Sequence, residues 1–392
     1  MREKTWYALS AVVLIVSAAI RVAAYPIFTS DYTYFIAKWF DQLKSHPGLT
    51  AFQYPFADYS PLYVYFLKIL TYIPVYSLYS EKTLSLVFDI LIAWGAYLLL
   101  RDTSDKEYTP SQLFLVFAIM LSIPTVVVNT SLWGQSDSVY TAGVVFALYF
   151  ILRDKPLPAA LAYALALSIK LQAIFFLPIL VGYYWRRGAK DLWQLLLIPA
   201  VYIVTIIPAW LGGASFMGLL LTYFNQSKEY TDLSVSAQSI FAFFTYLPIS
   251  GGARSVLFWL GIIIAGVCAV GITYLMSRIP PEKSSAYKIV FLSVVCVLII
   301  PYLLPRMHER YFYLADVLSV IYACYRPRQW FIPVAIVIAS FVSYMPFLSG
   351  QVSWFAALHI DLRVGASILA ITLGVMLLML YQEWREQPSR TP

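Results

Sequence analysis

Charged side chains are scarce in this 392-residue chain: they make up 12% of it, whereas hydrophobic residues make up 61%. Soluble domains carry about 25% charged and about 45–50% apolar residues. The shortage of charge therefore excludes an ordinary cytosolic enzyme, and the hydrophobic excess excludes a disordered or fibrous protein. The composition predicts an all-α polytopic membrane protein.

Cysteine and histidine are also rare, at three residues each. Cys268, Cys296 and Cys324 lie in apolar or membrane-edge stretches, so we predict neither a disulfide framework nor a zinc site. The chain has no GxGxxG, P-loop, HExxH or GxSxG motif, so nothing indicates nucleotide binding. An enzyme at the outer face of a membrane would instead take lipid-linked substrates.

Long apolar stretches dominate the chain, and a spanning helix needs about 20 mainly apolar residues. The pattern predicts about 12 transmembrane helices, within a range of about 11 to 13. They are expected near residues 5–24, 82–100, 111–129, 138–151, 157–170, 171–184, 193–212, 255–275, 289–304, 311–324, 331–347 and 364–381. The stretch 61–78 is apolar too, but its lysine and two prolines favour an interfacial or re-entrant helix. With no internal repeat visible, residues 1–392 are predicted to form a single transmembrane domain.

Basic residues set the expected orientation. With a cytoplasmic N-terminus, the inner segments hold 16 of the 27 Lys and Arg residues within 57 residues. The first outer segment, 25–81, has the same length but only three lysines, which is a strong positive-inside bias. Both termini are therefore expected in the cytoplasm, with 382–392 as a short tail and 5–24 as an uncleaved span. This bias accounts for the net charge of +7, and we predict no nucleic-acid partner.

The first outer segment carries two carboxylates at membrane level, Asp31 and Asp58. Residues 33–44 are amphipathic, which predicts a helix lying in the interface. A helix cap is the alternative for each carboxylate: Asp31 would precede 32–44, and Asp58 or Ser60 would precede 61–78.

Two further polar elements interrupt the spans on the same side. Between the third and fourth spans, Trp133, Gly134, Gln135 and Asp137 are more polar than a turn requires, and the glycine permits a close backbone approach. Between the fifth and sixth, Lys170 lies at the membrane edge. It either snorkels or faces a cavity, where it would attract an anion such as phosphate.

The last polar element is the segment Arg306–Tyr311, which has four ionisable groups within five positions. Arg306 and Arg310 suit phosphate because the guanidinium fork matches phosphate oxygens, and His308 adds a titratable donor. The alternative is a buried salt-bridge network, including Glu309, that clamps two helices.

In this order, these elements resemble the GT-C glycosyltransferases. The similarity is closest to bacterial membrane mannosyltransferases described as related to the GPI-anchor mannosyltransferases, and more distant to dolichyl-phosphate-glucose glucosyltransferases. It rests on an Asp soon after the first span, D-Y-x-P-L at Asp58–Leu62, W-G-Q-x-D at Trp133–Asp137, K-x-Q-A at Lys170–Ala173 and R-M-H-E-R-Y at Arg306–Tyr311. One departure is Ser60, where relatives usually have Pro. The resemblance covers residues 1 to about 325.

The resemblance implies a transferase that takes one hexose from a polyprenyl-phosphate carrier to a hydroxyl on the non-cytoplasmic face. Mannose is the first expectation and glucose the second. The acceptor is a glycolipid, a glycan or a protein, and membrane lipids surround the enzyme. A bacterial inner (cytoplasmic) membrane, with the active site facing the periplasm, is the expected location. In the family, the first Asp is the catalytic base, here Asp31, and the His is associated with the donor phosphate, here His308.

The chemistry assigns further roles. Asp58 would be the second choice for the base, or would position the acceptor. Arg306, Lys170 and Arg310 would stabilise the leaving phosphate together with His308. The sugar and acceptor are expected to contact further polar and aromatic side chains, namely Trp133, Gln135, Asp137, Tyr59, Gln172 and Glu309. Inversion is the simplest outcome, because no second nucleophile is evident.

We expect no cofactor and no metal, because Arg and Lys near a lipid-phosphate leaving group make a metal unnecessary. A divalent-metal site at Asp31, Asp58, His308 and Glu309 is the alternative. Two other functions remain open. A secondary transporter would place its polar groups near mid-membrane in repeated halves, and a lipid-linked glycan polymerase or ligase would have a dominant late outer loop.

Overall fold

The computed structural model describes residues 3–226, 230–245, 247–280, 282–356, 358 and 360–385. Helices make up most of this part of the chain, which confirms the all-α membrane fold. The two strands that it contains, β1 (Ser234–Val235) and β2 (Met307–His308), form one short parallel pair. Of the predicted tail 382–392, residues 386–392 lie outside the described residues.

Every predicted span contains a helix, but the helices differ in length. Within the described residues, seven are long and apolar enough to cross a membrane, or eight if one bent pair counts as a span. The expected total of about 12 spans is therefore not confirmed. The helix α3 (Pro61–Leu70) has only ten residues, and α7 (Asp137–Leu152) and α8 (Pro156–Ile169) are apolar but also short.

Contacts divide the chain into two compact units, and the single-domain organisation stays a prediction. The first unit comprises residues 1–231 and 273–290. Its larger helices, besides those given above, are α1 (Glu3–Ala24), α2 (Ala37–Ser45), α4 (Ser77–Thr103), α5 (Pro110–Ser122), α9 (Leu177–Arg187) and α11 (Leu197–Leu211). Short helical segments connect them: η1 (Tyr32–Ile36), η2 (Thr50–Gln53), α6 (Pro124–Val127), η3 (Val128–Trp133), η4 (Leu171–Phe176), α10 (Ala189–Leu192), η5 (Trp193–Leu196), α12 (Phe216–Leu220), α13 (Thr222–Gln226) and η7 (Lys283–Ser285).

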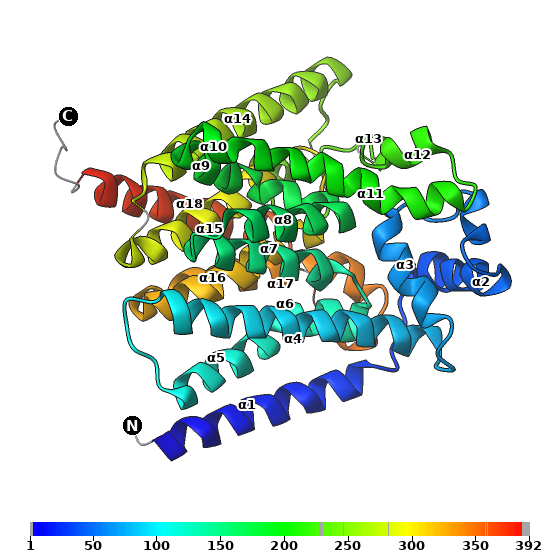
Figure 1. Cartoon of the computed structure of the whole chain (residues 1–392), viewed down its shortest axis with the longest axis horizontal. Coiled ribbons are helices and arrows are strands. Elements are labelled where there is room, and N and C mark those ends of the chain that lie inside the picture. Colours follow the sequence, from blue (N-terminus) through cyan, green and yellow to red (C-terminus); the bar gives the residue numbers. More distant parts are fainter. Residues whose placement is uncertain are drawn as a thin grey trace. The chain divides into compact units, whose positions relative to one another are not determined.

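The core of this unit is α7, which packs between α4 and α8 (Figure 1). The helix is short and almost entirely buried because its residues are apolar all round after Asp137. Small residues bring the helices close: a Cβ added at Gly143 would lie 2.8 Å from the Ala166 Cβ of α8. In turn, α1 packs on α5 and α11 packs on α8.

The second unit comprises residues 232–272 and 291–392. Its helices, parts of the first two of which belong to the other unit, are α14 (Gly251–Arg278), α15 (Ala286–Leu303), α16 (Tyr313–Tyr325), α17 (Phe331–Ser349) and α18 (Leu362–Arg385). Shorter turns are η6 (Ile240–Phe244), η8 (Glu309–Phe312), η9 (Pro327–Gln329) and η10 (Ser353–Phe355). Within this unit, α17 packs against both α16 and α18.

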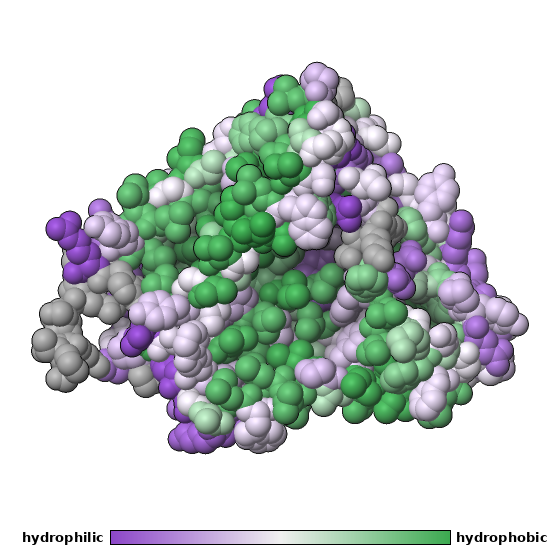
Figure 2. Space-filling model, turned by 90° about the horizontal axis from the view of Figure 1, so that it is seen from above, coloured by the Kyte–Doolittle hydropathy of each residue, from purple (hydrophilic) through white to green (hydrophobic). Residues whose placement is uncertain are grey.

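Large apolar side chains are exposed in the way that lipid contact requires. Along α14, Val256, Ile263, Val267 and Val270 are each 60–69% exposed and recur at helical spacing. Figure 2 shows apolar side chains over large parts of the visible face. A soluble protein rarely exposes such large apolar patches, so this surface supports an integral membrane protein.

Candidate active site

A broken helix presents the segment Trp133–Asp137, called here the W-G-Q-x-D segment. After α5, Pro124 interrupts the apolar stretch, and Pro110–Ser122 and Pro124–Trp133 meet at a bend of 53°. The second half ends in the π-helical turn η3, and Gly134 stops it in a left-handed conformation with φ +74°. The polar residues thus follow the end of a bent helix and lie buried in the first unit.

Buried polar contacts fix this broken helix to its neighbours. Arg21 of α1 forms an ion pair of 2.9 Å with Asp89 of α4 and donates to the Ser131 hydroxyl at 2.9 Å. Thr130 donates to the other oxygen of Asp89 at 3.1 Å. Because these charges are paired and hydrogen-bonded, they can remain buried and hold α1, α4 and η3 together.

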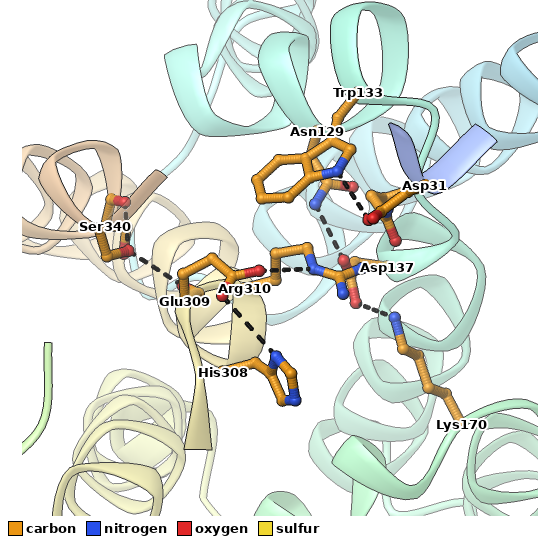
Figure 3. Close-up of polar contacts among 11 residues, drawn as sticks. Asp31, Asn129, Trp133, Asp137, Lys170, His308, Glu309, Arg310 and Ser340 are labelled. Atoms are coloured by element: carbon orange, nitrogen blue, oxygen red, sulfur yellow. Dashed lines mark hydrogen bonds and ion pairs between the residues drawn. The ribbon is translucent and has the colours of Figure 1, made fainter. Parts of the chain in front are cut away.

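Asp31 receives two hydrogen bonds from this segment. The indole nitrogen Nε1 of Trp133 donates to Asp31 Oδ2 at 3.0 Å (Figure 3), and Nε2 of Gln135 donates to the same oxygen at 2.8 Å. The Trp133 and Gln135 side chains are buried, whereas Asp31 is partly exposed. The second oxygen, Oδ1, accepts no hydrogen bond from the described residues, so this carboxylate is oriented and still has a vacant acceptor.

Helix capping does not account for these carboxylates. Asp31 precedes η1 with helical backbone angles, and its side chain makes no capping hydrogen bond. Ser60, which precedes α3, makes no capping bond either, and its hydroxyl donates to the carbonyl of Ser168 at 2.5 Å. Asp58 lies in an exposed loop, and partial burial raises the pKa of its carboxyl group. No described residue hydrogen-bonds that carboxyl group.

The helix α4 also contacts the W-G-Q-x-D segment and holds it in place. Ser85 donates to the Gln135 carbonyl at 2.8 Å, and Ser138 donates to the Ser85 carbonyl at 2.9 Å. Glu81 of α4 lies against Gly134: a Cβ added at Gly134 would be only 2.7 Å from Glu81 Oε2. The left-handed backbone and this close contact together favour glycine at this position.

Lys170 and Asp137 form a buried ion pair with an Nζ–Oδ1 distance of 2.5 Å (Figure 3). Asn129 donates to the other Asp137 oxygen at 2.9 Å, and the Asp137 side chain is inaccessible to solvent. The Lys170 ammonium also lies 5.4 Å from the ring centre of Tyr59. The pair favours a role for Lys170 and Asp137 in holding the segment, and their predicted contacts with phosphate and sugar stay predictions.

Gln172 follows in the turn η4 and is buried, with an Oε1 atom that has no hydrogen-bond partner among the described residues. Such an orphaned acceptor is uncommon in a folded core. The predicted contact of Gln172 with the substrate stays a prediction.

The predicted phosphate ligands Arg306, His308 and Arg310 belong to the second unit. Arg306 has a left-handed backbone with φ +62°, and its guanidinium lies 4.5 Å from the ring centre of Phe258. A non-glycine residue in this conformation stores strain, and such residues cluster at functional sites. His308 lies in β2 opposite Val235 of β1.

Glu309 neutralises part of this basic cluster. Its carboxylate lies 3.1 Å from Arg310 Nε and 3.7 Å from His308 Nδ1, and Ser343 donates to its backbone carbonyl at 3.1 Å. Burial alone would raise the pKa of Glu309, but His308 and the Arg310 charge outweigh it and hold the pKa below its usual value. These contacts support the alternative of a salt-bridge network, and the phosphate role of the cations stays a prediction.

Metal ligands do not gather within the described residues: no group of three or more His, Cys, Asp or Glu side chains there could hold an ion. The alternative donor set combines residues of both units and is not tested by this observation. Metal independence itself stays a prediction.

Sequence reasoning missed Glu81, Lys82 and Asn129. Lys82 is buried and donates to three carbonyls at and just beyond the end of α1, including that of Ile27 at 2.6 Å. The adjacent charges of Glu81 and Lys82 at the edge of an apolar stretch were the available signal, because such groups must be paired when they are buried. Asn129 gave no signal, since its partner Asp137 lies beyond the left-handed turn at Gly134.

The comparisons with known proteins bear on this site. The model of glycosyltransferase family 87 matches residues 56–305, more than half of the chain. The match includes Asp58, the W-G-Q-x-D segment and Lys170; Arg306 directly follows it, and Asp31 lies well before its first residue. No curated protein matches the chain.

Proposed function

The chain belongs to glycosyltransferase family 87, a GT-C type family of membrane glycosyltransferases, and we propose that it transfers one hexose from a polyprenyl-phosphate carrier to an acceptor hydroxyl. Family membership confirms the expected GT-C enzyme class, and it favours this class over the alternative of a secondary transporter. Mannose is the proposed sugar, with glucose second. We place the reaction at the periplasmic face of a bacterial inner membrane, with both termini in the cytoplasm.

The geometry of Asp31 carries the proposal. Two N–H donors hold its Oδ2 atom, the residue is partly exposed, and its Oδ1 accepts no hydrogen bond from the described residues. A base in an acyl or glycosyl transfer must be oriented and must keep a free lone pair for the proton that it removes. Asp31 meets both conditions.

The proposed step is a single displacement at the anomeric carbon. The acceptor oxygen forms the new bond to this carbon while its proton passes to Asp31 Oδ1. The bond from carbon to phosphate oxygen breaks, and polyprenyl phosphate leaves with the electron pair. Negative charge develops on the leaving phosphate and must be stabilised. We assign this stabilising role to Arg306, His308 and Arg310.

The test is a transfer assay with the purified protein in detergent. Radiolabelled polyprenyl-phosphate mannose and polyprenyl-phosphate glucose are supplied separately, with and without EDTA, and with membrane lipids and glycans as acceptors. The proposal predicts a product one hexose larger from one donor only, unchanged by EDTA. A ladder of products would favour a polymerase, and loss of activity with EDTA would refute metal independence.

A further inference from the structure

A groove of about 700 Å³ lies in the first unit, within the range of ~300–1,000 Å³ that is usual for small-molecule sites. One wall is residues 52–59 of the first outer segment, and the other is residues 214–226, which include α12 and α13. None of the residues that line the groove forms a hydrogen bond with Asp31, so the groove is distinct from the cluster of Asp31, Trp133 and Gln135.

The two walls of the groove are fixed to each other. The backbone of Leu49 packs so closely on the turn after α11 that a Cβ added at Gly212 would lie 2.4 Å from the Leu49 carbonyl oxygen. Across the groove, the Gln226 amide donates to the Asp58 carbonyl. At the end of the second wall, the Tyr223 hydroxyl donates to the Leu167 carbonyl at 2.5 Å. The groove is therefore pre-formed, which limits the ordering cost of binding.

The lining combines aromatic rings with neutral hydrogen-bonding groups. Tyr54 is 58% exposed, and Phe56 and Tyr59 line the same wall. Opposite are the hydroxyl of Thr222 and the amide of Asn225. Among the described lining residues there is no lysine or arginine, and Asp58 is the one carboxylate.

This chemistry selects among occupants. A phosphate group would find no cation among the described lining residues and would be repelled by Asp58. A hydrocarbon chain would leave the amides and the carboxylate desolvated without partners. A sugar satisfies both features, because its hydroxyls pair with amides and carboxylates while its C–H face packs on aromatic rings. The volume exceeds that of a single hexose.

Tyr59 connects the groove to the polar network around Asp31. Its ring lies 5.3 Å from that of Trp39, on the helix that follows Asp31, and 5.4 Å from the Lys170 ammonium. Lys170 in turn pairs with Asp137 of the W-G-Q-x-D segment. One end of the groove thus adjoins the elements that hold the proposed base.

We propose that this groove binds the acceptor and that the acceptor is a glycan of at least two sugar rings. The inference rests on the proposed transfer reaction. The ring that carries the attacking hydroxyl lies at the Tyr59 end, and the preceding rings lie between the aromatic wall and α13. A short oligosaccharide should therefore be a better acceptor than the corresponding monosaccharide.

Gly218 offers a direct test. It lines the groove, and only Ser215 atoms, at 3.4 and 3.6 Å, lie within 4 Å of an added Cβ. Gly218→Trp should fill the groove without a backbone clash. The control is Gly266→Trp, because Gly266 lies on α14 outside the groove and nothing lies within 4 Å of its added Cβ. Initial rates are measured with the labelled donor and with mono-, di- and trisaccharides of mannose, glucose, galactose and N-acetylglucosamine. Hydrolysis of the donor without acceptor is measured in parallel.

For one of the four sugars, we expect the trisaccharide to have a lower KM as acceptor than the monosaccharide. Gly218→Trp should raise the trisaccharide KM at least about tenfold, whereas the Gly266→Trp control keeps the wild-type KM. Asn225→Ala, at an exposed position, should raise it about threefold to tenfold through one lost hydrogen bond.

Two failures are distinguishable. The groove proposal is wrong if the wild-type protein hydrolyses the donor but no saccharide accepts the sugar. It is also wrong if Gly218→Trp and Asn225→Ala both keep the wild-type KM for the trisaccharide. If the wild-type protein neither transfers nor hydrolyses either donor, the proposed function is wrong.

Discussion

Gly134 is the position where the smallest change should do the most damage. It has φ +74° and ψ +57°, a left-handed conformation that costs an L-residue about 1–2 kcal/mol. An alanine Cβ would also lie 2.7 Å from Glu81 Oε2, and Glu81 is 1% exposed, so its carboxylate has no solvent into which to move. Overpacking of this kind costs about 1–3 kcal/mol more. Gly134→Ala should therefore destabilise the protein by about 2–5 kcal/mol.

Gly48→Ala is the matched control. Gly48 is also left-handed, with φ +56°, but nothing lies within 4 Å of its added Cβ. It should cost only the backbone strain of about 1–2 kcal/mol. The difference between the two variants measures the Glu81 contact alone.

Activity gives the second readout. The neighbours of Gly134 are Trp133 and Gln135, which hold Asp31, and a displacement of about 1 Å at a catalytic group can cost about 10²-fold in rate. Melting temperature in detergent and transfer kcat are measured for both variants. If Gly134→Ala has the same melting temperature as Gly48→Ala and keeps the wild-type kcat, the structural role given to Gly134 is wrong.

Three further predictions concern the charged groups. Lys170→Met should lower stability by about 3–5 kcal/mol because it removes the ammonium group that pairs with the buried Asp137 carboxylate, and adding Asp137→Asn should recover part of the melting temperature. Arg306→Gly should raise the donor KM about 10- to 100-fold without lowering the melting temperature, since glycine accepts φ +62°; a lower melting temperature with unchanged donor KM would establish a purely structural role. The pKa of Glu309 is lowered on folding, so its contribution to stability is complete above its ordinary pKa and is lost as pH falls through the lowered value. Wild-type melting temperature should thus fall more steeply than that of Glu309→Gln below about pH 5, and parallel curves would contradict this.

The helices were predictable because the apolar stretches are long and nearly free of charge. The bend at Pro124 was not predicted, although the proline was visible, because the stretch 111–129 has the composition of a straight span. Lengths near 14–16 residues, as in α7 and α8, come from tight packing within the core rather than from contact with lipid.

The site was predictable only where motifs marked it. Asp31, Trp133 and Gln135 were singled out separately, and the structure shows that they bond to one another across about a hundred residues of sequence. The close contact between Glu81 and Gly134 could not be predicted, because it depends on how α4 lies under the bent helix. The cap alternative for Asp31 was reasonable from local sequence and fails because tertiary donors compete for the carboxylate.

The central claim is that Asp31 is the base. Asp31→Asn keeps an oxygen that can accept from Trp133 and Gln135 but removes the basic carboxylate, and Asp41→Asn, at an exposed position of α2, is the control. The measurement is kcat for hexose transfer from the accepted polyprenyl-phosphate donor at saturating acceptor. The account predicts a loss of about 10²–10⁴-fold for Asp31→Asn, with unchanged melting temperature and donor KM, and no loss for Asp41→Asn. Wild-type kcat in Asp31→Asn would contradict it.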